Sequence, residues 1–266
     1  MKVFVFTKKS IAIISCIILV FISIIAYFAY TNYIKDELIC STELMCNSVA
    51  SESFMDKVKC LAQGEEKVAY LTFDDGPNGA VTPKILDILE SKGIKATFFV
   101  IGKNVEQYPE IVKRAYEEGH YIANHGYDHN NKNLYRNEES FINEVKKTDF
   151  AIGEAIGMKN YCSHVFRFPN GFMSPNNKYE KQKALNILFN MDYTYIDWNC
   201  LNNDSVKKYS REQLLNNLKR TSKNKNTLII LMHDTKDVND SSVVLEDSIN
   251  YLEEQGYEFR NFYDLI

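Results

Sequence analysis

The sequence predicts an α/β domain built on a largely parallel sheet or barrel, with a transmembrane helix on its N-terminal side. Two observations predict this organisation. From residue 67 to residue 266, strand-like runs alternate with amphipathic helical patterns, which is typical of βα units. Before them, residues 11–30 form an uncharged apolar run that is long enough to cross a bilayer as a helix. The chain is therefore expected to hold one globular domain, residues 67–266, and one membrane anchor.

The part of the chain before the globular domain divides into three segments. Residues 1–10 contain three lysines and are expected to form a cytoplasmic tail, because positive charge stays on the cytoplasmic side of a membrane anchor. Residues 11–30 are the expected anchor, and the polar residues 31–66 are expected to form an extracytoplasmic stalk. The sequence thus predicts a single-pass protein of the cell membrane with its domain outside. The alternative is secretion after signal-peptide cleavage, although the apolar core of a signal peptide usually has only ~7–15 residues.

The predicted strands are short runs rich in β-branched and aromatic residues, and the first of them ends at an Asp-Asp-Gly-Pro turn. In chain order they cover 68–73, 96–101, 121–123, 164–168, 193–197, 228–232 and 257–260. The predicted helices lie between the strands, where apolar residues recur every three or four positions. They cover 82–91, 104–118, 138–156, 178–190, 210–222 and 243–254. This alternation favours parallel strands that are joined by helices.

The composition is that of a globular protein, with 45% hydrophobic and 25% charged residues. The formal net charge is -4 at pH 7, and the isoelectric point is about 5.8. These values exclude the basic surface with which nucleic-acid-binding domains contact phosphates, so no nucleic-acid partner is expected.

Five cysteines follow the apolar run, namely Cys40, Cys46, Cys60, Cys162 and Cys200. An exported domain can form disulfides, but five is an odd number, so at least one thiol is expected to be free or paired with another chain. A disulfide within the first three cysteines and one between Cys162 and Cys200 are both open at this point.

Charged side chains stand at the ends of four predicted strands. Asp74 and Asp75 follow the first strand, Arg167 and Asp197 end two later strands, and His233 follows the apolar run 228–232. In a parallel βα barrel the carboxyl ends of the strands gather on one face, where active sites are built. These separated segments therefore predict one common site.

Two histidines and one of the paired aspartates form a candidate metal site. His125 and His129 are four residues apart, which lets both imidazoles reach one ion from a compact loop. One carboxylate of Asp74 and Asp75 completes an Asp-His-His set, and three protein ligands with open positions are typical of a catalytic zinc site. The other carboxylate is then free to act as a general base.

A hydrolase also needs a general acid to protonate its leaving group, and His233 is the candidate. Arg167 is costly at an apolar strand end without an anionic partner, and an aspartate of the 74/75 pair is the expected one. Asp197 is expected to hold His233 by a hydrogen bond and to raise the pKa of its imidazole.

Five ordered segments resemble the motifs of the polysaccharide deacetylase family, the NodB-homology carbohydrate esterases of carbohydrate esterase family four. They are TFDDGP (72–77), HGYDH (125–129), RFPNG (167–171), DW (197–198) and LMH (231–233). The resemblance covers residues 67–266. It implies a distorted (β/α) barrel with seven strands and a bound divalent metal, usually zinc, with another ion such as Co²⁺ as the alternative. It also implies removal of acetyl groups from N-acetylated sugars.

Position by position, the resemblance also implies a role for each site residue. Catalytic roles fall to Asp74 as general base, His233 as general acid, Arg167 as the residue that orients Asp74, and Asp197 as the residue that tunes His233. Metal-binding roles fall to Asp75, His125 and His129. Substrate-binding roles fall to the backbone N–H of Asn170, which faces the oxyanion, and to Trp198 and Leu231, which surround the acetyl methyl group.

The expected substrate is a cell-wall polysaccharide, because an anchored and outward-facing enzyme has the wall as its nearest polymer. Peptidoglycan N-acetylglucosamine is the preferred choice, and N-acetylmuramic acid, chitooligosaccharides and O-acetylated xylan are the alternatives with the same chemistry. A catalytically inactive glycan-binding relative is the alternative from a different class. It would lack a metal ligand, the base or the acid, whereas the sequence has all of them.

Overall fold

The computed structural model describes residues 54–235 and 238–265. Residues Ser53–Ile266 form one compact unit. The expected cytoplasmic tail (1–10), the expected anchor (11–30) and most of the expected stalk (31–66) lie outside the described residues. Within the described ranges, no helix combines the length and the apolar character that a membrane crossing requires.

The centre of the unit is one sheet in which every strand pair is parallel, as the alternation of strands and helices predicts. Its strands lie in the order β5-β4-β3-β2-β1-β7-β6, and β8 pairs with β1 beside this path. Among the described residues no ladder joins β5 to β6, so the curved sheet is an incomplete barrel. The strands are β1 (Val68–Asp74), β2 (Thr97–Val100), β3 (Tyr121–Asn124), β4 (Val165–Phe166), β5 (Thr194–Tyr195), β6 (Cys200–Leu201), β7 (Thr227–His233) and β8 (Glu258–Phe259).

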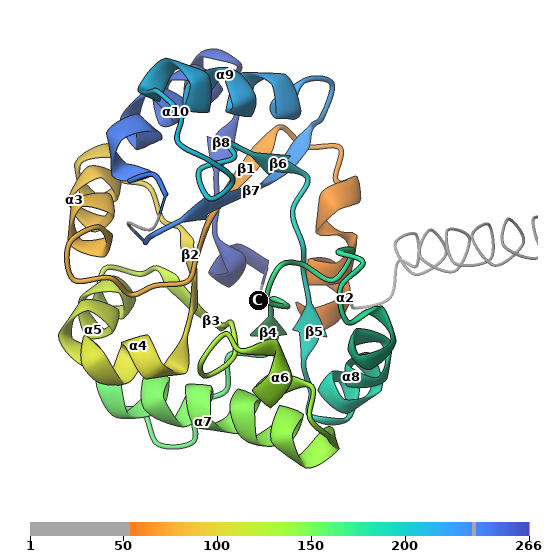
Figure 1. Ribbon diagram of the computed structural model, residues 1–266. Helices are drawn as coiled ribbons and strands as arrows, with labels where there is room; N and C mark the ends of the chain where they lie inside the picture. Colours follow the sequence, from red (N-terminus) through yellow and green to blue (C-terminus); the bar gives the residue numbers. More distant parts are fainter. Residues whose placement is uncertain (1–53, 236–237, 266) are drawn as a thin grey trace, which may run out of the picture. The chain divides into compact units, whose positions relative to one another are not determined.

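The longer helices lie around the outside of the strands (Figure 1). They are α3 (Thr82–Lys92), α5 (Pro109–Glu117), α7 (Glu138–Ile156), α8 (Lys178–Asn190), α9 (Arg211–Ser222) and α10 (Ser242–Glu254). Shorter helical segments are α2 (Phe54–Cys60), η1 (Leu61–Gln63), α4 (Gly102–Gln107), α6 (Asn131–Leu134) and η2 (Phe262–Leu265).

Local capping explains where the predicted helices begin and end. The Asn137 side chain accepts a hydrogen bond from the Ser140 N–H at the start of α7, and Gly157 ends that helix with a left-handed φ of 75°. Ser210 and Gln213 form a capping box at the start of α9. The expected single helix over 104–118 is two helices, because Pro109 has no N–H to continue the hydrogen-bond ladder of α4.

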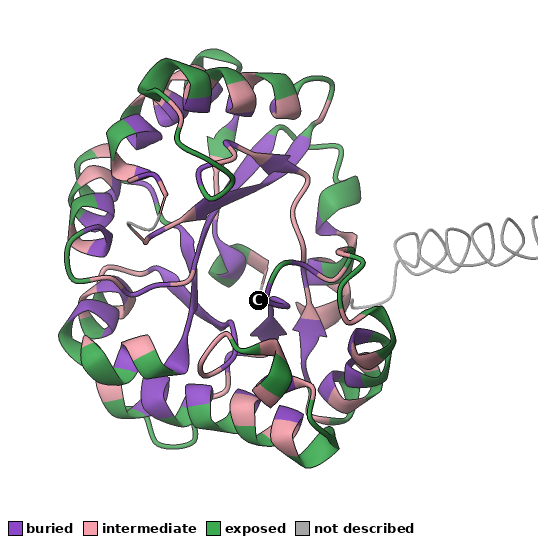
Figure 2. Cartoon of the chain, in the orientation of Figure 1, coloured by how far each residue is buried: buried purple, intermediate pink, exposed green. Residues whose placement is uncertain are grey.

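The buried residues belong to the strands and to the inward faces of the helices (Figure 2). Residues 54–66, which we expected in the stalk, contribute to this core: Val58 of α2 and Leu61 of η1 are buried against Val68 and Tyr70 of β1. The short strand β6 was not predicted, because its two residues have no extended apolar run around them.

One of the two disulfides that the sequence left open is not formed. Cys162 and Cys200 are both free, so they do not form a disulfide with each other. Cys200 is buried, and its Sγ lies 3.4 Å from the Thr221 hydroxyl. Cys60 is disulfide-bonded, and its partner lies outside the described residues.

Candidate active site

The two adjacent aspartates point into different surroundings at the end of β1. Asp74 is the last residue of the strand and pairs in register with His233, the last residue of β7. Asp75 follows with a φ of 74°, which is a left-handed conformation. The side chain of Asp75 therefore does not continue the alternating up-and-down pattern of the strand's side chains. Side chains from two neighbouring strand ends thus meet at one edge of the sheet, as predicted.

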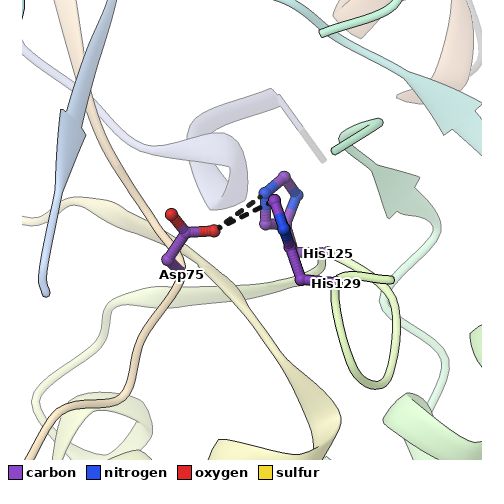
Figure 3. Close-up of side chains that lie close together, drawn as sticks. All are labelled: Asp75, His125 and His129. Atoms are coloured by element: carbon purple, nitrogen blue, oxygen red, sulfur yellow. Dashed lines mark ion pairs between the residues drawn. The ribbon is translucent and has the colours of Figure 1, made fainter. Parts of the chain in front are cut away.

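Asp75, His125 and His129 form the expected cluster (Figure 3). The Oδ1 atom of Asp75 lies 3.3 Å from Nε2 of His125 and 3.4 Å from Nε2 of His129. One ligand atom from each residue lies within 4.8 Å of the others. Burial acts to raise the pKa of Asp75, but its interactions with the nearby imidazoles outweigh this effect and hold the pKa below its usual value. The carboxylate is therefore ionised, as a metal ligand must be.

The hydrogen bonds around the cluster fit a bound divalent cation. The Nδ1 atom of His125 lies 2.7 Å from the Arg167 carbonyl oxygen, which can only accept, so Nδ1 carries the proton and Nε2 offers a lone pair. A partner of this kind fixes the tautomer of a metal-binding histidine. In the part of the chain that the structure describes, Oδ1 of Asp75 is buried and has no hydrogen-bond donor. An ionised oxygen without a donor, facing two imidazole nitrogens, suits a cation between them.

Arg167 holds the other aspartate, as expected from the sequence. Its Nη1 atom lies 2.7 Å from Oδ1 of Asp74, and the two side chains are 0% and 4% exposed. The same guanidinium donates to the Thr72 hydroxyl at 2.7 Å and to the Ile196 carbonyl oxygen at 3.0 Å. It also stacks on the Phe99 ring, with Cζ 3.9 Å from the ring centroid. These contacts compensate the buried charges and fix the carboxylate of Asp74 beside the metal cluster.

The partner of His233 is Asp204, and the expected pairing with Asp197 is wrong. Nδ1 of His233 lies 2.7 Å from Oδ1 of Asp204, while Oδ2 of Asp204 accepts the backbone N–H of His233 at 2.8 Å. Burial lowers the pKa of His233, but the hydrogen bond and charge of Asp204, with the charges of Asp74 and Asp75, raise it to about 9. The Nε2 atom of His233 faces Oδ2 of Asp75 at 4.0 Å.

Asp197 instead holds the loop that follows Arg167. Its Oδ1 atom accepts the backbone N–H of Phe172 at 2.9 Å, and its Oδ2 atom accepts that of Met173 at 3.1 Å. Both carboxylate oxygens are therefore occupied by this loop. This explains why the segment YIDW, although it ends a strand, does not supply the partner of the histidine.

The backbone N–H of Asn170 is a free donor in this loop. The next three N–H groups are all used: that of Gly171 bonds to the Phe168 carbonyl oxygen at 2.7 Å, and those of Phe172 and Met173 bond to Asp197. Within residues 54–235 and 238–265, no acceptor is found for the Asn170 N–H. This unpaired donor follows Pro169, which has no N–H, and precedes three occupied N–H groups, so it is available for an incoming oxygen atom.

The two apolar site residues lie on separate elements. Leu231 is 6% exposed and precedes His233 by two positions in β7, so both side chains face the same side of the sheet. Trp198 is partly buried against the core cluster that contains Phe99 and Ile229, and its ring also closes over Gly171.

Sequence reasoning missed Asp204, and the signal that would have found it is weak. Asp204 follows Cys200–Leu201, the two-residue strand β6, which pairs with β7. Recognition of that strand would have placed Asp204 after a strand end, as for the other site residues. The sequence NND at 202–204 is typical of a turn, and nothing else in it indicates a buried carboxylate.

The chain is similar in sequence and in fold to several known proteins. The family model for polysaccharide deacetylase matches residues 62–195. A peptidoglycan-N-acetylglucosamine deacetylase of Bacillus cereus is 36% identical over 206 residues, which cover 75% of this chain and 71% of that protein. A peptidoglycan-N-acetylmuramic acid deacetylase of Bacillus subtilis is 30% identical over 207 residues, which cover 77% and 74% of the two chains. The crystal structure of the catalytic domain of a Eubacterium rectale peptidoglycan N-acetylglucosamine deacetylase superposes with a TM-score of 0.67 at 30% identity and covers 73% of this chain and 88% of that one.

Proposed function

This chain belongs to the polysaccharide deacetylase family, and we propose that it hydrolyses the N-acetyl groups of peptidoglycan N-acetylglucosamine and releases acetate. The observation that carries the proposal is the placement of Asp74 and His233 beside the Asp75, His125 and His129 cluster. The Asp74 carboxylate, which pairs with Arg167, and the His233 imidazole, which pairs with Asp204, then flank one candidate metal site. General base and general acid catalysis require such an arrangement. The relatives named for peptidoglycan N-acetylglucosamine support the choice of sugar.

The metal ligands of the proposed enzyme are Asp75, His125 and His129. We infer zinc as the ion, with another divalent metal such as Co²⁺ as the alternative, because one carboxylate and two imidazoles are common zinc ligands. When bound, the ion acts as a Lewis acid on the acetamide carbonyl and helps to activate water.

Asp74 is the proposed general base. Its carboxylate is fixed by Arg167 through Oδ1, which leaves the other oxygen, Oδ2, toward the metal cluster, 3.8 Å from Nε2 of His125. In this position the carboxylate takes a proton from the attacking water. Arg167 keeps Asp74 from turning away through their short hydrogen bond.

His233 is the proposed general acid. The amine leaves only when it is protonated, so the imidazole must carry a proton at the pH of the reaction. The hydrogen bond from Nδ1 to Asp204 holds the ring in place and leaves Nε2 to deliver the proton.

The backbone N–H of Asn170 is the proposed donor to the oxyanion that forms on the carbonyl oxygen. Such donors are worth ~3 kcal/mol of transition-state stabilisation in comparable sites. Trp198 and Leu231 are the proposed apolar contacts of the acetyl methyl group, which has no polar atom to pair.

The proposed location is the cell membrane, with a single span at residues 11–30 and the catalytic domain outside the cytoplasm. The uncharged run and the lysines before it support this orientation. Secretion after cleavage is the alternative. A protease added to intact cells distinguishes the two, because an anchored domain is cleaved from the cell surface while a secreted one is found in the medium.

Acetate release by the purified full-length chain tests the function. We expect release from peptidoglycan that a chelator abolishes and zinc restores, and we expect Asp75→Ala to abolish it. Mass spectrometry of the digested product identifies the deacetylated sugar. Deacetylated N-acetylmuramic acid would favour the activity named for the Bacillus subtilis relative, and release only from chitooligosaccharides or acetylated xylan would change the polymer. A folded, metal-loaded protein that releases acetate from none of them would leave a glycan-binding role instead.

A further inference from the structure

The loop 170–174, which carries the free N–H of Asn170, has an unusual backbone. Asn170 and Gly171 both adopt left-handed conformations, with φ values of 64° and 79°. A Cβ atom on Gly171 would lie 2.8 Å from Cη2 of Trp198, so the tryptophan ring leaves room only for glycine. The backbone of this loop is therefore held in a conformation that costs free energy unless its surroundings stabilise it.

Asp197 stabilises one edge of the loop. Its two carboxylate oxygens accept the consecutive N–H groups of Phe172 and Met173, at 2.9 and 3.1 Å. The Met173 side chain is 82% exposed, so its own packing does not hold the loop there. Hydrogen bonds to a charged acceptor are about twice as strong as neutral ones, which makes this carboxylate the main constraint on the N–H edge.

Lys181 of α8 stabilises the other edge. Its Nζ atom donates to the Gly171 carbonyl oxygen at 2.6 Å and to the Ser174 carbonyl oxygen at 3.2 Å. The residue is only 1% exposed, although lysine is rarely buried without a partner. Burial lowers the pKa of this ammonium group, and the charge of Asp197 acts in the opposite direction. Burial of an ammonium group costs free energy, and the two hydrogen bonds to backbone oxygens offset part of this cost. The same two bonds hold the carbonyl edge of the loop.

Asp197 also connects the loop to the proposed base. The carbonyl oxygen of Asp197 accepts a hydrogen bond from Nη2 of Arg167 at 3.3 Å, and Arg167 holds Asp74. Asp197 thus contacts the loop through its side chain and the arginine that holds the base through its carbonyl oxygen.

We propose that Asp197 and Lys181 are positioning residues that clamp the loop 170–174 from its two edges and so aim the Asn170 N–H at the oxyanion. This inference rests on the proposed function. Asp197 pairs the N–H groups of Phe172 and Met173 and leaves that of Asn170 unpaired, while Lys181 holds the carbonyl oxygens of Gly171 and Ser174. No contact of either side chain with the candidate metal cluster or with His233 is found among the described residues. The effect of the clamp is specific to the transition state, because the oxyanion forms only there.

The test uses Asp197→Asn and Lys181→Met in the full-length chain. Asparagine keeps the size of the side chain but places an amide donor against one N–H, and methionine keeps the length of the lysine stem without its charge. Asp192→Asn and Lys183→Met are the matched controls, because both residues are exposed and lie close by in the sequence. Four quantities are measured for each variant: kcat for acetate release, KM for acetate release, bound zinc, and amide hydrogen exchange of the segment 168–176.

We expect each clamp variant to lower kcat at least ~10-fold with KM within about threefold of the wild type, because one oxyanion donor is worth about 10²–10³ in kcat. Zinc content should stay at the wild-type level, and exchange in 168–176 should become faster. The double variant should lose less than the product of the two single losses, since both residues hold one loop. The two control variants should behave as wild type.

An active wild type whose clamp variants keep kcat within about twofold overturns the inference alone, even if loop exchange becomes faster. A rise in KM with unchanged kcat also overturns it, because the clamp would then act on substrate binding. Loss of zinc in either variant assigns the residues to the metal site and overturns it as well. A wild type without activity refutes the proposed function, and the inference with it.

Discussion

Replacement of Asp204 by asparagine should move the alkaline limb of the pH profile of kcat to lower pH. In the wild-type chain the carboxylate of Asp204 accepts from Nδ1 of His233 at 2.7 Å, and the pKa of His233 is raised to about 9 from an ordinary 6.5. Without that charge, the burial of the imidazole is opposed only by the more distant carboxylates, so the pKa falls toward or below 6.5. The general acid acts only when protonated, so activity is lost as the pH rises through this pKa.

The size of the effect follows from the two pKa values. At about pH 7.5, a group with a pKa of about 9 is ~97% protonated, and one with a pKa of 6.5 is only ~10% protonated. The variant should therefore have a kcat ~10-fold lower at this pH, and its alkaline limb should lie about two pH units lower than that of the wild type. Near pH 6 most imidazoles of both proteins carry a proton, so the difference should shrink to less than about twofold.

The assay is acetate release at saturating substrate over a range of pH, with zinc content measured for each sample. Because the substitution leaves Asp75, His125 and His129 unchanged, the difference between the two proteins reports the contribution of Asp204. Asp247→Asn is the matched control, since that carboxylate pairs with Arg211 on the surface. A loss in kcat that is the same at every pH would show that Asp204 acts on structure and not on the proton of His233, and an unchanged profile would refute the reasoning altogether.

Three further predictions concern metal binding and stability. Asp75→Ala should reduce bound zinc to background in a protein that stays folded, and metal retained at the wild-type level would contradict the assigned ligand set. Gly171→Ala should lower the free energy of unfolding by ~1–3 kcal/mol in urea titrations, because a left-handed φ and the Trp198 ring both oppose a Cβ atom; an unchanged midpoint would contradict this. Burial lowers the pKa of His120 from 6.5 to about 4 in the folded protein. As the pH falls, the imidazole is therefore protonated in the unfolded chain before it is protonated in the folded one. The free energy of unfolding should fall by up to ~3 kcal/mol as the pH drops from about 6.5 to about 4. His120→Gln should make this part of the pH–stability curve flatter, and a curve of the same slope would count against the assignment.

The elements that the sequence predicts well are those with strong local signals. The helices over 138–156 and 178–190 have the predicted bounds, and β1 and β7 extend beyond their predicted ranges by only one or two residues. Long amphipathic periods and continuous apolar runs are the features that periodicity detects. The two-residue strands β4, β5 and β6 have little periodicity of their own, because their conformation comes from pairing with neighbours.

The site shows the same division between local and long-range information. The candidate metal cluster could be predicted because His125 and His129 are four residues apart, and the pairing of Arg167 with Asp74 because both residues stand at recognisable strand ends. The partner of His233 could not, because the choice between Asp197 and Asp204 depends on how the 198–204 segment crosses beside β7. The role of Lys181 was also beyond the sequence, since a lysine in an amphipathic helix is usually solvent-exposed.

The adjacency of Asp74 and Asp75 has a mechanical consequence. Consecutive Cα atoms are held about 3.8 Å apart by covalent geometry, so one peptide unit fixes the distance between the backbone positions of the proposed base and the proposed metal ligand, while Arg167 fixes the direction of the Asp74 carboxylate. A displacement of the strand end carries both backbone positions with it. A substitution elsewhere in the core can therefore shift the pair as a body without separating its two functions, whereas an insertion between the two residues cannot be absorbed by any rearrangement of side chains.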